Sequence, residues 1–192
     1  PRSTPLYSSA ASDVYKRQVP VLKHGDLTIW DSVAICEYVA ELVPEAGLWP
    51  EDKATRAMAR SLVADIHSYS GAHWAAVPFV AIGEVMPTNV RARTGPINIP
   101  EDIQKILDRN TNMWRDCRIK FAEHGPYLFG QFSIADAMSA PLVNRLVTYS
   151  VLLGDIEADY TDTMRNHPNM LEYIALAEAE TWQHKPSEHP FN

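Results

Sequence analysis

The sequence predicts an α+β protein in which a β-hairpin and one helix precede a long, wholly helical region. Residues 19–22 and 27–30 are β-prone runs, and the Gly-containing loop between them is a hairpin signal. Apolar residues then recur at helical spacing in several segments of residues 48–192. We therefore expect a small mixed domain at 19–47, an all-helical domain at 48–192, and a separate leader at 1–18.

The helix of the small domain is expected to begin at Asp31-Ser32. Either residue can serve as N-cap, because a side-chain oxygen accepts a hydrogen bond from a free N–H group of the first turn. Apolar residues recur at helical spacing up to residue 42, and Pro44 with Gly47 ends the helix. A two-stranded hairpin is marginal by itself, so we expect further strands as its packing partners.

The larger domain is predicted to be a series of helices separated by turn signals. The longest has a core face of apolar residues at i, i+3, i+4 and i+7 spacing and ends before Gly125. Pro141 removes one backbone N–H from the helix after it, which should bend that helix. Residues 79–100 are expected to be a loop with a short helical turn. The predicted helices span residues 54–77, 101–123, 133–150, 159–165 and 168–182.

Charge and composition exclude several classes of function. The formal net charge is −7, whereas nucleic-acid binding needs a basic surface, so we expect no nucleic-acid partner. No apolar run is long enough to cross a bilayer, so we expect no membrane partner. Cys36 and Cys117 lie in apolar helical patterns without metal-ligand spacing. This predicts buried thiols, no metal, and a reducing, cytoplasmic setting.

Residues 1–18, "PRSTPLYSSAASDVYKRQ", do not read as part of the fold. They lack helical or strand periodicity and the apolar segment of a secretory signal. The string resembles the translation of a sequencing adapter or an assembly artefact. A native disordered leader or a transit peptide is the alternative. We leave the segment out of the fold in either case.

Two stretches resemble a known family. "VPVL…LTIWDSVAICEYVAEL" is similar to the second half of the thioredoxin-like domain of glutathione transferases, and "GPYLFGQFSIADAMSAPLV" to their all-α C-terminal domain. The order and spacing of the two stretches match that family from residue 19 to about 182. The amino-acid sequence of the second stretch resembles that of bacterial members of the family. The resemblance implies a partial thioredoxin-like domain at 19–47, truncated at its N-terminal side, followed by the helical domain.

The resemblance also implies a glutathione-binding half-site. Val19 would pair its backbone with the cysteinyl part of glutathione like an added strand, with Pro20 as a cis-proline. Asp31 and Ser32 would hold the amine and carboxylate of the γ-glutamyl end at a helix N-terminus, which favours anions. The alternatives are an ordinary strand start for Val19-Pro20 and a simple helix cap for Asp31-Ser32.

Ser133 and Asp136 form a Ser-x-x-Asp pattern ahead of an apolar run. This is the pattern of a capping box, in which the two side chains satisfy backbone N–H groups at a helix start. We therefore assign the pair to folding and reject it as a catalytic pair.

Four further residues are candidates for a second-substrate pocket or a dimer contact. Arg91 and Arg93 lie in the Pro/Gly-rich loop and could hold an anionic co-substrate, although solvated arginines are the simpler interpretation. Asp65 and His67 lie on the first long helix, which borders that pocket and the dimer interface in the family. Packing is the simpler interpretation for His67.

These patterns predict a glutathione transferase as the intact parent protein. Glutathione would be the co-substrate and a small electrophile the second substrate, with a homodimer expected from the family. The Tyr, Ser or Cys that activates the glutathione thiol is expected upstream of Val19, so we expect this chain to be inactive. The alternative is a non-catalytic interaction module of the same fold. A channel-like relative is disfavoured because no predicted helix could span a bilayer.

Overall fold

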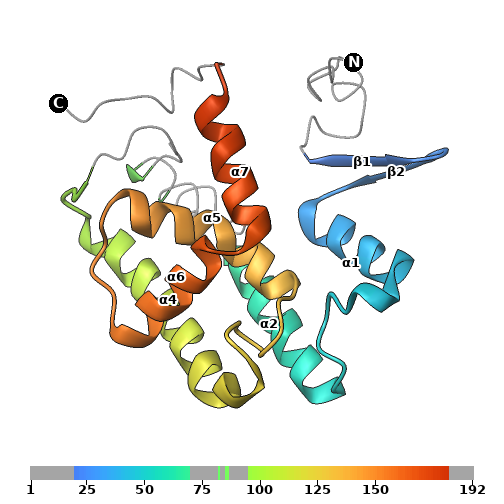
Figure 1. Cartoon of the computed structure of the whole chain (residues 1–192), viewed down its shortest axis with the longest axis horizontal. Coiled ribbons are helices and arrows are strands. Elements are labelled where there is room, and N and C mark those ends of the chain that lie inside the picture. Colours follow the sequence, from blue (N-terminus) through green and yellow to red (C-terminus); the bar gives the residue numbers. More distant parts are fainter. Residues whose placement is uncertain (1–19, 70–81, 83–84, 87–94, 182–192) are drawn as a thin grey trace. The chain divides into compact units, whose positions relative to one another are not determined.

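The computed structural model describes residues 20–69, 82, 85–86 and 95–181. The chain divides into two compact units, of which the first ends at Leu48 and the second begins at Trp49. The first contains a two-stranded hairpin and a helix, and the described part of the second contains helices without a named strand (Figure 1). The predicted α+β class is thus confirmed.

The hairpin of the first unit is formed by β1 (Val21–His24) and β2 (Leu27–Trp30). The strands are antiparallel, with Val21 opposite Trp30 and His24 opposite Leu27. Gly25 adopts φ 59° in the two-residue turn, a region that glycine enters without steric cost. β1 starts two residues later than predicted, because its limits are set by pairing with β2.

The helix α1 (Ser32–Leu42) follows β2 directly, with the bounds that the sequence predicts. A short 3₁₀ turn, Pro44–Ala46, comes next, and Gly47 at φ 60° closes it. His24 Nδ1 lies 2.7 Å from the Tyr38 hydroxyl, which joins the end of β1 to α1. None of the residues from 20 to 48 is buried, so this unit has no enclosed core of its own.

The helices of the second unit follow the predicted order. The first expected helix is described to Tyr69, and the remainder of its predicted range lies outside the described residues. The fourth expected helix begins at Asp155 rather than 159, because Gly154 in extended conformation acts as its N-cap. The helices are α2 (Lys53–Tyr69), α4 (Glu101–Phe121), α5 (Ile134–Thr148), α6 (Asp155–Arg165) and α7 (Pro168–Ala179), with a 3₁₀ turn at Ala122–His124.

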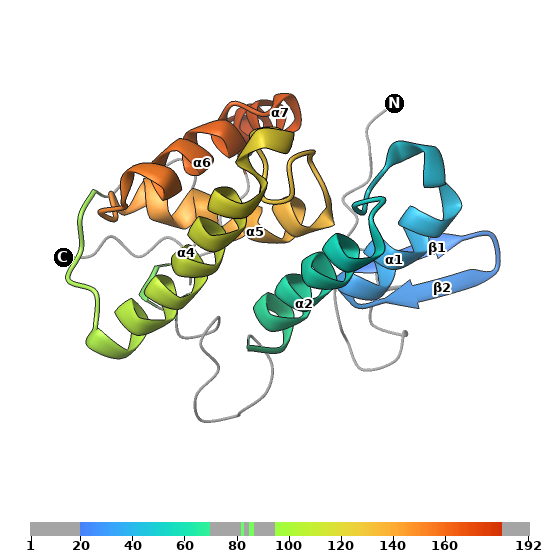
Figure 2. The ribbon, with the colours of Figure 1, turned by 90° about the horizontal axis from the view of Figure 1, so that it is seen from below.

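The core of the second unit lies where α5 packs against α2 and α6, and α4 packs against α6 (Figure 2). Trp114 of α4 and Tyr160 of α6 are fully buried and meet edge to face, with ring centroids 5.1 Å apart. Such a pair adds about 0.5–1.5 kcal/mol to the burial of its apolar area. Within the described residues, no helix is long and apolar enough to cross a membrane.

Two acidic side chains cap the N-terminal ends of helices in this unit. Asp52 Oδ2 accepts hydrogen bonds from the Thr55 N–H group at 2.7 Å and from its hydroxyl at 2.8 Å, ahead of α2. These bonds lower the pKa of Asp52, because they favour the carboxylate. At the start of α5, Ser133 and Asp136 form a capping box. Local polar contacts thus fix the starts of α2 and α5.

Candidate functional site

The candidate site lies at the start of α1, where the chain leaves β2. Asp31 adopts φ 77° and ψ 130°, which costs a non-glycine residue on the order of 1–3 kcal/mol. Its Oδ1 atom accepts hydrogen bonds from the N–H groups of Val33 at 2.9 Å and Ala34 at 3.3 Å. Its carbonyl oxygen accepts one from Ile35 at 3.0 Å. Of the two predicted caps, Asp31 is therefore the N-cap, and these bonds hold its strained backbone.

Ser32 is the first residue of α1 and is half-buried. Its N–H and hydroxyl groups make no hydrogen bond within the described part of the chain. Because Asp31 already satisfies the next two N–H groups, Ser32 supplies two remaining donors at the positive end of the helix dipole. A carboxylate is the kind of group that such a position favours.

The other residues predicted for this half-site are placed only in part. Pro20 is exposed and directly precedes β1. Val19 lies outside the described residues. The pairing of Val19 with a ligand backbone and the cis form of Pro20 both stay predictions.

The Ser133–Asp136 pair lies in the interior of the second unit. Asp136 is fully buried, and its carboxylate accepts four hydrogen bonds. The donors are the Leu128 N–H at 3.0 Å, the Ser133 N–H at 2.9 Å, the Ser133 hydroxyl at 3.0 Å and the Tyr160 hydroxyl at 3.1 Å. Burial raises the pKa of Asp136, and these hydrogen bonds oppose the rise. All four donors come from the protein, which fits a folding role.

Two of the four candidates for a second-substrate pocket or dimer contact lie within the described residues. Asp65 forms a two-point ion pair with Arg109 of α4, at 2.7 Å to Nη2 and 3.3 Å to Nε. His67 is half-buried on α2. Arg91 and Arg93 lie outside the described residues. The proposed roles of these four residues stay predictions.

Neither thiol of the chain is suited to nucleophilic chemistry. Burial raises the pKa of Cys36, with smaller contributions from Glu37 and Asp31. Burial also raises the pKa of Cys117 to about 11. A reactive cysteine needs a lowered pKa, because the thiolate is the nucleophile. Among the described residues, no group of three or more His, Cys, Asp or Glu is arranged to hold a metal.

Comparison with known families finds a match near the start of the chain. Residues 3–41 match the family model "Glutathione S-transferase, N-terminal domain". Over this range the chain is similar to glutathione transferases. The match supports the resemblance predicted from the sequence, whereas the bacterial subgroup stays a prediction. The matched range includes most of the leader at 1–18, whose origin also stays a prediction.

One curated glutathione transferase relative comes from a plant. Glutathione S-transferase 1 of Dianthus caryophyllus is 52% identical over 40 residues, which are 21% of this chain. The matched stretch spans 18% of that protein, well under two thirds of its length.

The solved glutathione transferases share the fold. A Burkholderia glutathione transferase homolog with bound glutathione matches with a TM-score of 0.60 and 23% identity, over 91% of this chain and 80% of that chain. Glutathione transferase F2 of Populus trichocarpa matches with a TM-score of 0.60 and 17% identity, over 85% of this chain and 77% of that chain. At these identities the likeness establishes the fold alone.

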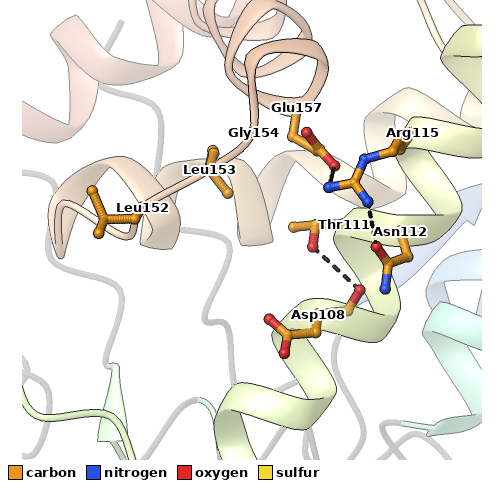
Figure 3. Close-up of a pocket in the computed structure, with 8 residues that line it drawn as sticks. All are labelled: Asp108, Thr111, Asn112, Arg115, Leu152, Leu153, Gly154 and Glu157. Atoms are coloured by element: carbon orange, nitrogen blue, oxygen red, sulfur yellow. Dashed lines mark hydrogen bonds and ion pairs between the residues drawn. The ribbon is translucent and has the colours of Figure 1, made fainter.

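Within the described part of the second unit, two ion pairs that join different helices were missed by sequence reasoning. Arg109, the partner of Asp65, lies 44 positions away in the sequence, so no local sequence pattern could have predicted their contact. Arg115 of α4 pairs with the buried carboxylate of Glu157 on α6, beside the hollow whose lining residues Figure 3 shows. The only hint of the second pair is Glu157 three residues after Gly154, at a position typical of a helix cap.

Proposed function

We propose that the start of α1 binds the γ-glutamyl end of glutathione, in a protein whose intact form transfers the glutathione thiolate to a small electrophile. The observation that carries this proposal concerns Ser32, whose N–H and hydroxyl groups make no hydrogen bond within the described residues. Next to it, Asp31 caps the same helix with a strained backbone. The glutathione transferase relationship supplies the ligand.

The two ends of the γ-glutamyl group receive different partners. We assign its carboxylate to the Ser32 N–H and hydroxyl groups, because charged acceptors form the stronger hydrogen bonds at a helix N-terminus. We assign its ammonium to the negatively charged Asp31 carboxylate, which also caps the helix through Oδ1. The backbone of Val19, ahead of Pro20, is assigned to the cysteinyl part of the ligand.

Activation of the thiol is assigned to a group outside the described residues. The family resemblance gives this role to a Tyr, Ser or Cys of a first strand, before residue 19, whose hydrogen bond favours the thiolate. Cys36 and Cys117 are unsuitable because burial raises the pKa of both thiols. A chain without the activating group is expected to bind glutathione without turning it over.

We also propose three further properties that the family resemblance implies. They are a homodimer, a cytoplasmic location, and a second-substrate pocket that involves Asp65, His67, Arg91 and Arg93. Sedimentation of the purified chain at several concentrations tests the dimer. A single species at the monomer mass of 21.6 kDa would contradict it.

The test of glutathione binding is calorimetric titration of the full chain with glutathione and with cysteinylglycine, which lacks the γ-glutamyl group. Wild type is expected to prefer glutathione. Ser32→Ala removes one hydrogen bond to a charged group, so glutathione binding should weaken by about tenfold while cysteinylglycine binding stays unchanged. The matched control is Ser61→Ala, an exposed serine that bonds only the Ala57 carbonyl.

Two outcomes would contradict the proposal: equal affinity of wild type for both ligands, or unchanged glutathione binding by Ser32→Ala. A conjugation assay with a chlorodinitroarene then separates the two functional classes. Binding without turnover favours the interaction module for the chain as it stands. Turnover would place an activating group within the chain itself.

A further inference from the structure

The first turn of α7 depends on a histidine. His167 is the N-cap of α7, and Pro168, which follows it, has no N–H group. The carbonyl oxygen of His167 accepts hydrogen bonds from the N–H groups of Met170 at 2.9 Å and Leu171 at 3.0 Å. The Asn169 N–H group remains, and it donates to Nδ1 of the His167 imidazole at 3.2 Å. Each N–H group of this turn therefore has an acceptor, and one of these acceptors is a group that titrates.

The hydrogen bond from Asn169 requires a neutral ring with one particular tautomer. A backbone N–H group can only donate, so Nδ1 of His167 offers its lone pair and the ring proton lies on Nε2. The imidazolium form carries a proton on both nitrogens and has no acceptor left. Its positive charge is also unfavourable at a helix N-terminus, which is the positive end of the helix dipole. Protonation of His167 therefore takes the acceptor away from the Asn169 N–H group.

Two aromatic side chains hold the imidazole ring in place. Phe132 stacks on His167, with ring centroids 4.4 Å apart and an interplanar angle of 25°. Tyr127 meets the same ring edge to face, with centroids 5.9 Å apart. A half-turn of the stacked ring would bring a C–H group to the Asn169 N–H, which is no acceptor. Rotation of the ring therefore cannot restore the hydrogen bond after protonation.

Among the described residues, no carboxylate forms an ion pair with the His167 ring. The titratable side chain that touches the ring is Tyr127, and burial together with the Asp136 charge raises its pKa, so it stays neutral. On α6, Arg165 donates to a side chain of α5. On α7, the first carboxylate is that of Glu172, which is exposed and lies beyond the first turn. The response of the ring to pH thus follows from its own cap bond.

The remaining contacts of α7 make the cap important for its stability. Of the twelve side chains of α7, Met170 alone is buried. Leu171, Tyr173 and Leu176 are exposed. A helix of this length is marginal in water without packing. Loss of one cap bond should therefore change how often α7 opens.

We propose that His167 is a pH-sensitive cap, which stabilises the first turn of α7 while its ring is neutral and releases that turn when the ring is protonated. Histidine side chains ordinarily titrate between about pH 5 and 8. The stabilisation is present at the alkaline end of this range and is lost as pH falls through it. From the usual contribution of an N-cap, local opening of α7 should increase by about fivefold on protonation.

The experiment is NMR spectroscopy of the ¹⁵N-labelled full chain between about pH 8 and 5. At the alkaline end, long-range ¹H–¹⁵N correlation should show His167 with an unprotonated Nδ1 and a proton on Nε2. The Asn169 amide signal should shift together with the titration of the His167 ring. Hydrogen exchange of the α7 amides, corrected for the intrinsic effect of pH, should become about fivefold faster, while exchange at buried Leu142 of α5 stays unchanged.

His167→Asn keeps a side-chain acceptor at the N-cap and removes the titration, so opening of α7 should no longer depend on pH. The matched control is His124→Asn, an exposed histidine at the end of a 3₁₀ turn whose ring contacts Phe121. This variant should respond to pH as wild type does. The proposal is overturned if Nδ1 of His167 carries the proton at the alkaline end, if opening of α7 in wild type does not change with pH, or if His167→Asn keeps the wild-type response.

Discussion

The Tyr160 hydroxyl donates a 3.1 Å hydrogen bond to Asp136 Oδ1 and thereby ties the middle of α6 to the start of α5. Both side chains are fully buried, and burial with the neighbouring Asp136 raises the pKa of Tyr160 well above 10. The same carboxylate receives three donors from the turn before α5 and its cap. Asp136 therefore joins two helices and a turn through one side chain.

Replacing Asp136 by alanine should destabilise the helical unit by on the order of 3 kcal/mol, because its buried donors lose their acceptor. Glutathione binding should persist in the folded fraction. Chemical denaturation followed by circular dichroism measures the loss of stability. Asp116→Ala, an exposed acid on α4, is the control and should change stability by less than about 0.5 kcal/mol. An unchanged melting temperature for Asp136→Ala would show that the pair has no folding role.

The carboxylate of Asp52 should make stability depend on pH. Its pKa is lowered by the hydrogen bonds from Thr55, so the folded state binds the proton less tightly than the unfolded state does. The resulting stabilisation is present above the unfolded pKa, near 3.8, and is lost as pH falls through the folded value. Asp52→Asn keeps a capping side chain but removes this titration. The stability difference from wild type should therefore shrink with falling pH; a constant difference between pH 7 and 2 would contradict this account.

Asp31→Asn separates the capping role of Asp31 from its charge. An asparagine at the N-cap keeps the acceptor for Val33 and Ala34, so α1 should retain its helicity. Glutathione binding should weaken by about five- to tenfold at low salt, because the ligand ammonium loses an opposite charge. The effect should diminish at high salt. Calorimetry at two salt concentrations measures both effects, and a salt-independent loss would point to damage of the helix cap instead.

Gly130→Ala should destabilise the turn before α5 more strongly than Gly95→Ala destabilises its loop. Both glycines have positive φ, 94° and 75°. A Cβ at Gly130 would lie 2.5 Å from His124 Cβ, whereas a Cβ at Gly95 would have no atom within 4 Å. We expect a loss of about 1–2 kcal/mol at Gly95 from the backbone alone, and several kcal/mol at Gly130. Thermal unfolding compares the two variants, and equal losses would refute the steric account.

The parts of the fold that the sequence predicts are those with local causes. The cap at Asp31 and the Pro44–Gly47 stop fix α1 within adjacent residues, and both ends lie as expected. The core face of α4 follows from side-chain spacing, and Leu107 and Trp114 on it are buried. The strained backbone of Asp31 could not be predicted, because it depends on how β2 meets the helix.

The parts that the sequence does not predict are set by distant pairing. The limits of β1 depend on its register with β2. Tyr160 reaches Asp136 across 24 positions, and Arg109 reaches Asp65 across 44. No periodicity links residues at such separations. The hollow at Glu157 arises in the same way, from residues of α4 and α6 that only packing brings together.

The absence of buried residues from 20 to 48 has a consequence for cooperativity. Amide protons of β1, β2 and α1 can exchange with solvent through a local opening that exposes no apolar core, whereas those of Leu142 and Val143 exchange only when the helical unit opens. One melting curve would then average two independent equilibria, and a single unfolding free energy would describe the helical unit alone. A ligand held at Asp31 and Ser32 would slow exchange in the hairpin and α1 while leaving the helical unit unchanged.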